Sequence, residues 1–227
     1  MFRWLCPRRK SSRNLSILSQ VFTPESAIQF ETMIEDIRAN IDNQLIESLA
    51  NRFSSLKCVP LSLSAQFPSK IGYIPIMEEA KKFNLCMFYL PPNSVLPFHN
   101  HPNQHVLLKV VLGHLDMTSF DIINDSSHHE VVHVGKEYPT TSRTTEIVSS
   151  RDEGAKIVYP NRRNVHRIST KSEGALFMDF VFPPYDHDHS IAYFEDTKEE
   201  GRVKAVSERD VCLDMQLVSL SEIFQHN

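Results

Sequence analysis

The residues best placed to do chemistry in this chain are three histidines, His99, His101 and His166. His99 and His101 form an H-x-H pair, and side chains alternate along a strand with period two, so both imidazoles should point to one face of an extended segment. His166 lies in another strand-like stretch and could complete a three-coordinate face on one metal ion. Held on one face, a metal keeps coordination positions open for reactants. The pattern predicts a metal site near the mouth of a small β-barrel.

The elements expected to position these histidines are short strands that begin near residue 57. Turn residues such as Pro91-Pro92 and Gly113 separate the apolar runs, which is typical of an all-β sandwich or barrel. Neither βαβ alternation nor a G-x-G-x-x-G motif is present, so a dinucleotide-binding fold has no support. The predicted strands are 85–90, 105–112, 115–122, 131–134, 145–148, 156–159, 165–169, 175–182, 192–194 and 211–217.

The region before the strands divides into two segments. Apolar residues recur at three- and four-residue steps over 23–53, which predicts helices with a break near 40–43 and Pro24 at the first helical position. We therefore expect a helical extension, 23–56, packed on a barrel domain, 57–227. Residues 1–22 are basic, with no acid before Glu25, and predict a flexible tail, a short nuclear signal or a weak mitochondrial presequence. The expected compartment is cytoplasmic and/or nuclear, with mitochondria as the alternative.

Composition excludes several classes of protein. The chain has 227 residues, of which 41% are hydrophobic, and this suits one domain with an extension. A net charge of -4 argues against a nucleic-acid partner. No apolar run approaches the roughly 20 residues of a membrane span, so no membrane partner is expected. The four cysteines form no C-x-x-C pattern and are expected to be reduced thiols.

The segments around the three histidines resemble the two motifs of the cupin superfamily. His99-Asn100-His101 leads to Gly113 as in the first motif, although the usual glutamate is absent at positions 105 and 106. Gly154 and Pro160 keep the spacing of the second motif, while Arg162 replaces a glycine and His166 falls one residue late. This resemblance implies a mainly β fold, a double-stranded β-helix (jelly-roll-like) barrel.

A narrower resemblance covers roughly residues 70–196. Several segments are similar to the cysteamine (2-aminoethanethiol) dioxygenase and plant cysteine oxidase family. They are the stretch L-P-F-H-N-H-P-N-Q-H-V-L-L-K-V-V-L-G, Asn164-Val165-His166, and Phe177-Met178-Asp179 followed by Pro183-Pro184-Tyr185. The resemblance implies one Fe(II) ion per chain on the three histidines and addition of O2 to a thiol, which gives a sulfinic acid. Three neutral imidazoles would leave the ion its +2 charge and so favour a bound thiolate.

The same resemblance leaves the substrate open between cysteamine and the N-terminal cysteine of a protein or peptide. Both present an amine–thiol head and differ only in the tail. Oxidation of an N-terminal cysteine would mark a protein for degradation in proportion to oxygen supply, which implies an oxygen-sensing role. Members of this family are often monomeric, so a monomer is expected.

Five further residues are candidates beside the metal ligands, and three of them, His105, Arg167 and Tyr193, are expected next to the ligands or at the substrate cavity. Asp179 should face the substrate cavity, where it could bind a substrate ammonium or orient a histidine N–H, with an ion pair to Arg167 as the alternative. Tyr185 could bring its hydroxyl to the bound oxygen or thiolate, unless it is a packed rim residue. His105 is expected at the cavity wall, with direct ligation as the alternative, and Tyr193 beside the ligands or in the core.

Two other classes of function remain open. One is a metal-dependent isomerase or hydrolase that uses zinc or manganese, since three nitrogen ligands suit many divalent ions. The other is a non-enzymatic cupin module that binds metal. His128, His129 and His133 are expected in a solvated loop, and Asp186 to His189 in a polar loop that could shape the entrance.

Overall fold

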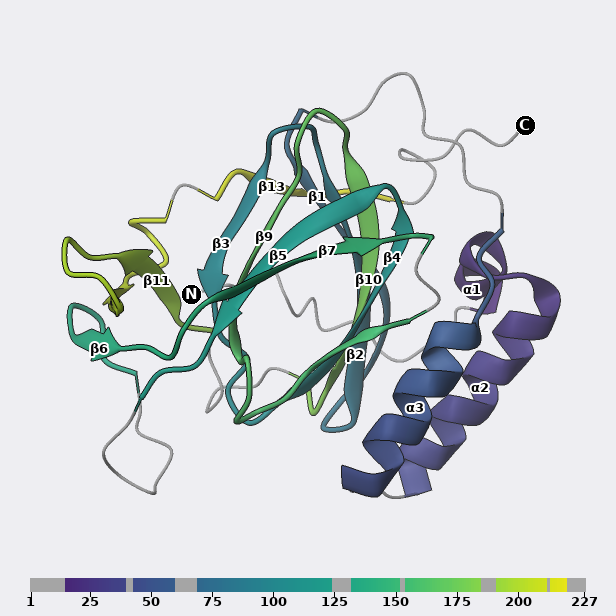
Figure 1. Cartoon of the computed structure of the whole chain (residues 1–227). Helices are drawn as coiled ribbons and strands as arrows, with labels where there is room; N and C mark the ends of the chain where they lie inside the picture. The colour runs from purple at the N-terminus through teal and green to yellow at the C-terminus, as the bar shows by residue number, and fades with distance from the viewer. Residues whose placement is uncertain are drawn as a thin grey trace.

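Three helices precede a series of strands in the computed structural model of the chain (Figure 1). The structure describes residues 15–39, 43–59, 69–123, 132–151, 154–184, 191–211 and 213–219. The helices are α1 (Leu15–Val21), α2 (Pro24–Ala39) and α3 (Asn43–Ser55). The strands are β1 (Ile71–Glu79), β2 (Phe83–Leu90), β3 (Val95–His99), β4 (His105–Leu112), β5 (His114–Phe120), β6 (Glu137–Pro139), β7 (Thr144–Ser149), β8 (Lys156–Val158), β9 (Val165–Ser169), β10 (Ala175–Phe182), β11 (Tyr193–Asp196), β12 (Arg202–Val206) and β13 (Met215–Leu217).

The strand pairing defines a double-stranded β-helix, which confirms the predicted cupin fold. One sheet has the order β13-β1-β2-β10-β4-β8 and the other the order β6-β12-β11-β3-β9-β5-β7. The antiparallel pairs β2–β10, β3–β9, β4–β8 and β5–β7 nest inside one another, as in a long hairpin that has rolled up. This is the connectivity of a jelly roll. The nesting places β3 and β9, which carry the histidines, side by side.

Strand β10 shows why the first sheet is apolar on both faces. Leu176, Met178, Phe180 and Phe182 belong to one buried cluster with the helices, while Phe177 and its alternating neighbours belong to the cluster inside the barrel. Successive side chains point to opposite faces, so a strand covered on both sides reads as a continuous apolar run. Figure 1 shows the three helices gathered beside this sheet. The helices cover one face of this sheet, and the second cluster and the site lie on its other face, inside the barrel.

The helical extension begins earlier than the sequence predicts. Residues 15–21 form α1, and Leu18, Val21 and Phe22 are buried against α2 and the sheet. The prediction of a flexible tail is therefore wrong for 15–22, because these apolar residues extend the same buried surface as α2. The break between α2 and α3 falls where it was predicted. Residues 1–14 lie outside the described residues, so the targeting prediction stays a prediction.

The turn between β4 and β5 requires a glycine. Gly113 has a φ of 77°, and a Cβ there would lie 2.7 Å from the carbonyl oxygen of Gly174. Both the left-handed conformation and the close approach exclude a side chain. The structure thus gives a reason for the glycine in the first cupin-like motif. Among the described helices none is long and apolar enough to cross a membrane, and the two described cysteines, Cys58 and Cys86, are free.

Phe180 joins the helical extension to the barrel. Its ring lies 5.4 Å from that of Phe30 in α2 and 5.8 Å from that of Phe53 in α3, centroid to centroid. We expect Phe180→Ala to lower the free energy of unfolding by about 3–5 kcal/mol, as for other buried phenylalanines. Urea denaturation measures this loss. Ile28→Ala, on the exposed face of α2, should stay within about 0.5 kcal/mol of the wild type. Equal effects of the two substitutions would contradict the assignment of the joining contact.

Candidate metal centre and substrate cavity

The strand ladder brings two of the three candidate ligands together directly. His99 is the last residue of β3, and His166 lies opposite it in β9, so the two form one cross-strand pair. Their ring centroids are 4.5 Å apart. His101 completes the group, with centroid distances of 5.0 Å to His99 and 4.9 Å to His166. One nitrogen from each histidine lies within 4.8 Å of the other two, an arrangement that could hold a single metal ion.

Period-two alternation along a strand, the predicted reason for the convergence, accounts for His99 but not for His101. Strand β3 ends at His99, and the register with β9 shifts between Leu96 and His99. His101 therefore lies beyond the strand, in the segment that leads to β4, and period-two alternation does not determine where it points. The ring nevertheless reaches the group and is 3% exposed. Contacts outside the ladder must hold it.

Burial keeps the three imidazoles in the form that binds metals. Removal from water lowers the pKa of His99 to about 4 and lowers those of His101 and His166 well below their usual range. The rings are therefore neutral at pH 7, as metal ligands must be. His99 donates from Nδ1 to the carbonyl of Pro97 at 2.8 Å, which leaves its Nε2 as a ligand atom.

His166 also has a ring nitrogen that could bind a metal ion. Its Nδ1 atom is buried and makes no hydrogen bond within the part of the chain that the structure describes. A buried polar atom without a partner costs about 1–3 kcal/mol. Neutral, clustered imidazoles fit a divalent metal, and three nitrogen donors leave further coordination positions open.

A cavity of about 40 Å³ adjoins His99 and His101 inside the barrel. It is lined by strands of both sheets and by the segment that contains β13, and the remaining lining residues are Asn84, Cys86, Phe88, Leu96, Asp179, Val181, Ile191, Tyr193, Leu213 and Met215. This volume exceeds the roughly 10–15 Å³ that a single water molecule needs. It suits a small polar head on a ligand rather than a large molecule.

Asp179 lies in this cavity, as the sequence predicts. It is 5% exposed, and its Oδ1 atom has no hydrogen-bond partner among the described residues. Burial raises the pKa of the carboxyl from 3.8 to about 8. The alternative, an ion pair with Arg167, is not what the structure shows, because the guanidinium of Arg167 stacks 4.7 Å from the ring centre of Phe98. Asp179 is thus a buried carboxyl aimed into the cavity.

Tyr193 also lines the cavity, where it pairs with His99 in the ladder between β11 and β3. Burial raises the pKa of its phenol, so the hydroxyl keeps its proton at neutral pH. Tyr185 lies outside the described residues, as do the Asp186–His189 loop and His128 and His129. The roles predicted for them stay predictions.

Two predicted neighbours of the site lie elsewhere. His105 begins β4, where alternate residues point toward the helices, and its ring stacks on Phe182 and meets the edge of Tyr159. The interior position belongs to Val106 instead. Arg167 follows His166 directly and so points to the opposite face of β9. The predicted cavity roles of His105 and Arg167 are therefore corrected by the strand parity.

Several polar residues at the site were missed from the sequence. Asn84 and Cys86 line the cavity from β2. Asn100 accepts from the backbone N–H of Ala192 at 2.8 Å, and Gln104 donates to the carbonyl of Pro183 at 3.0 Å. These amides tie the H-x-H segment to the chain before β11 and after β10. Their position next to the two histidines is the only signal that could have pointed to them.

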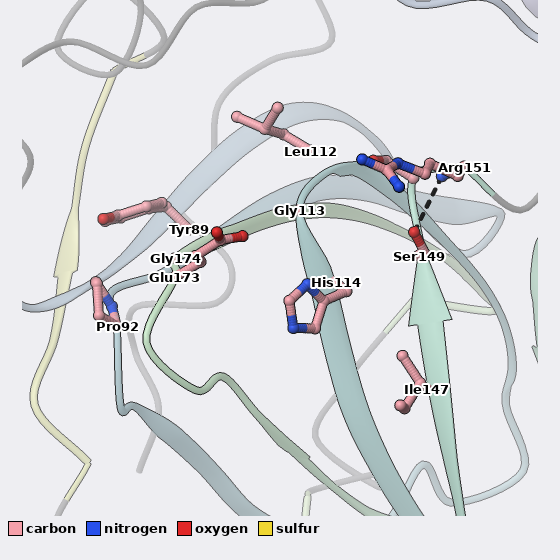
Figure 2. Close-up of a pocket in the computed structure, with 11 residues that line it drawn as sticks. Tyr89, Pro92, Leu112, Gly113, His114, Ile147, Ser149, Arg151, Glu173 and Gly174 are labelled. Atoms are coloured by element: carbon pink, nitrogen blue, oxygen red, sulfur yellow. Dashed lines mark hydrogen bonds between the residues drawn. The ribbon is translucent and has the colours of Figure 1, made fainter.

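A larger pocket, about 950 Å³, lies away from the three clustered histidines (Figure 2). It lies at the β4–β5 turn, and Figure 2 shows His114, Arg151 and Glu173 around it together with Tyr89. None of the three clustered histidines contributes to its wall. We assign the site to the smaller cavity because it adjoins the candidate metal ligands and the buried carboxyl.

A jelly-roll barrel with three buried histidines gathered around one point defines a cupin with a candidate metal site. A model of the PCO_ADO family matches residues 33–225, and the chain belongs to this family. The probable 2-aminoethanethiol dioxygenase of Dictyostelium discoideum is 33% identical over 187 residues, which cover 77% of this chain and 83% of that protein.

Two further relatives match with lower coverage of their own length. The 2-aminoethanethiol dioxygenase of Mus musculus is 26% identical, and the match covers 72% of this chain and 64% of the mouse protein. Plant cysteine oxidase 2 of Arabidopsis thaliana is 29% identical over 50% of this chain and 41% of its own. The chain thus spans most of the Dictyostelium protein but less than two thirds of the mouse and plant proteins.

Proposed function

We propose that this chain is a thiol dioxygenase, which adds both atoms of O2 to the thiol of an aminothiol and gives a sulfinic acid. The observation that carries the proposal is the buried three-histidine cluster in a chain of the PCO_ADO family. Relatives named for dioxygenation of 2-aminoethanethiol and oxidation of cysteine support the same reaction. They favour it over a metal-dependent isomerase or hydrolase and over a binding module without activity.

The metal we propose is a single Fe(II) ion held by His99, His101 and His166. A ferrous ion with three neutral ligands would keep its +2 charge, favour the thiolate of the substrate and supply the redox chemistry that O2 requires. The donor set itself suits several divalent metals. Iron is favoured because the proposed reaction needs a metal that can change its oxidation state, which zinc cannot do.

Asp179 is the residue we propose to recognise the amine of the substrate. Burial keeps its carboxyl largely neutral at pH 7. A substrate ammonium beside it would lower the pKa of the carboxyl and stabilise the carboxylate as a counter-charge. The protonated hydroxyl of Tyr193 is a hydrogen-bond donor on the same cavity wall. The apolar side chains around them exclude water from the reacting head.

The substrate class we propose is defined by the amine–thiol head. The small cavity matches such a head, which cysteamine and an N-terminal cysteine share. If the physiological substrate is a protein with an N-terminal cysteine, the product would mark that protein for degradation when oxygen is abundant. This chain would then act as an oxygen sensor.

The test is to load metal-free protein with Fe(II) under anaerobic conditions and then admit O2 together with a thiol. We expect mass spectrometry to show a gain of two oxygen atoms on cysteamine, on a Cys-initiated peptide, or on both. The same peptide with serine at its start should stay unchanged. Protein loaded with zinc should be inactive, because zinc has no redox chemistry.

The outcomes separate the alternatives. No mass gain on either thiol with fully iron-loaded protein would overturn the proposed reaction. Full retention of some other activity with zinc would favour an isomerase or hydrolase. The ratio of kcat/KM for cysteamine to that for the peptide then decides which tail the site accepts.

A further inference from the structure

The backbone of His101 is not held by the ladder that holds the other two histidines. His99 and His166 form a direct pair between β3 and β9, whereas His101 lies beyond the end of β3. His101 is nonetheless buried. Buried backbone N–H and C=O groups require hydrogen-bond partners, and outside a sheet these must come from side chains, turns or water. The partners of His101 therefore determine where its imidazole lies.

The side chain of Asn164 supplies partners for both backbone groups of His101. Its Oδ1 accepts from the His101 N–H at 3.0 Å, and its Nδ2 donates to the His101 carbonyl at 2.9 Å. Nδ2 also donates to the carbonyl of Tyr159 at 2.9 Å. Both N–H donors and one acceptor position of the amide are thus used to join two segments of backbone.

Asn164 is itself firmly placed. Its backbone N–H donates to Oδ1 of Asp121 at 3.0 Å, and it precedes β9 by one residue. His166 follows it by two residues in the same chain segment. One amide side chain therefore links the segment that leads to His166 with the segment beyond β3 that carries His101, through contacts that the barrel ladder does not provide.

We propose that Asn164 is the positioning residue that sets the imidazole of His101 relative to His99 and His166 and thereby fixes the geometry of the metal centre. The proposal rests on the metal site given under Proposed function. Productive geometry at such a centre needs ligands held within about 0.5 Å. Asn164 bonds both backbone groups of His101, whose carbonyl also accepts from the Gln104 N–H at 3.2 Å.

The test compares two hydrogen-bonded side chains at opposite ends of β9, the half-buried Asn164 and the buried Thr170. Asn164→Ala removes the bonds to His101. Thr170→Ala removes a side chain that donates to the carbonyl of Pro91 at 2.5 Å and accepts from the N–H of Ser94 at 3.0 Å, and so also joins two segments of backbone. The two substitutions should destabilise the protein similarly, but only Asn164 contacts the metal-binding segment.

Cobalt(II) is the probe, because its visible absorption reports the geometry of its ligands. Metal-free wild type, Asn164→Ala and Thr170→Ala are titrated with Co²⁺, and urea denaturation gives their stabilities. We expect Asn164→Ala to weaken cobalt binding by about 10–100-fold, as for other residues that orient metal ligands, and to change the visible spectrum. Thr170→Ala should keep the affinity and the spectrum of the wild type.

Asn164→Asp keeps the test decisive if Asn164→Ala does not fold. The carboxylate retains an acceptor for the His101 N–H but loses both donors, so we expect weaker cobalt binding and an altered spectrum. If wild type binds no cobalt, the proposed metal site fails. If wild type binds cobalt and both Asn164 variants match it in affinity and spectrum, or if Thr170→Ala weakens binding equally, the positioning role is overturned while the site stands.

Discussion

Replacing His166 by alanine is expected to abolish metal binding and thiol oxidation together while the barrel stays folded. The substitution leaves two imidazole ligands, one of which, His101, lies outside the strand ladder. Loss of a ligand should exceed the loss of about 10–100-fold in affinity that follows removal of an outer hydrogen-bond partner. Metal analysis after iron loading and dialysis, and mass spectrometry of a Cys-initiated peptide, measure the two effects.

The fold should tolerate His166→Ala because the substitution also removes a buried imidazole nitrogen that makes no described hydrogen bond. Urea denaturation of the metal-free protein checks this. His105→Ala is the matched control, since its ring packs on Phe182 and Tyr159 rather than on the histidine group. It should keep its metal and its activity. Metal retained in full by His166→Ala, or lost equally by His105→Ala, would show that the assigned ligand group is wrong.

The strands that the sequence predicts well are those with simple apolar runs. The predicted ranges for β4, β9 and β10 match the observed bounds, because both faces of these strands are covered or alternate clearly. β1 was missed because Gly72 and Pro75 resemble turn signals. The register of β1 with β2 shifts between Pro75 and Met77, and a bulge tolerates a proline that cannot donate to the ladder.

Two other parts of the fold differ from the sequence predictions for reasons of context. The short strands β6 and β12 were missed because three to five residues with charged neighbours give little pattern. Residues 132–134 were predicted as part of a strand and are not one. Their apolar pattern resembles an edge strand, but whether a short run forms a strand depends on a partner elsewhere in the chain.

The candidate site shows the same division between local pattern and tertiary context. The motif around His99, His101 and His166 is sufficient to predict the convergence that the structure shows. The placement of Asp179 follows from alternation along β10, and the same rule applied to β4 would have moved His105 to the helix side. Asn164 could not be assigned from sequence, because its role depends on where the chain turns after His99.

The contribution of Asp179 to the stability of the metal-free protein is expected to fall as the pH rises from about 4 to about 8. The three buried histidines, whose pKa values burial lowers, contribute in the opposite direction over the lower part of this range. Burial raises the pKa of its carboxyl to about 8 in the folded protein, against 3.8 for an ordinary aspartate. The folded state therefore holds a proton that the unfolded chain releases. A group of this kind contributes its full stability below the unfolded pKa and loses it as the pH passes through the folded pKa.

The size of the effect follows from the two pKa values. Each pKa unit of difference is worth about 1.4 kcal/mol, so the difference between 3.8 and about 8 sets an upper bound of about 6 kcal/mol. Asp179→Asn keeps the shape and cannot ionise. The free energy of unfolding of this variant minus that of wild type should rise with pH by several kcal/mol, measured by urea denaturation of chelator-treated protein.

The difference in the free energy of unfolding between variant and wild type isolates the effect of Asp179, because the other groups titrate in both proteins. Cys86→Ala is the control in the same cavity: burial raises the pKa of that thiol, which stays neutral over the whole range, so its difference from wild type should not change with pH. A flat difference for Asp179→Asn would mean that the carboxyl ionises freely in the cavity. The carboxyl would then already be charged when a substrate amine binds. Ammonium binding would not require the carboxyl to lose a proton first.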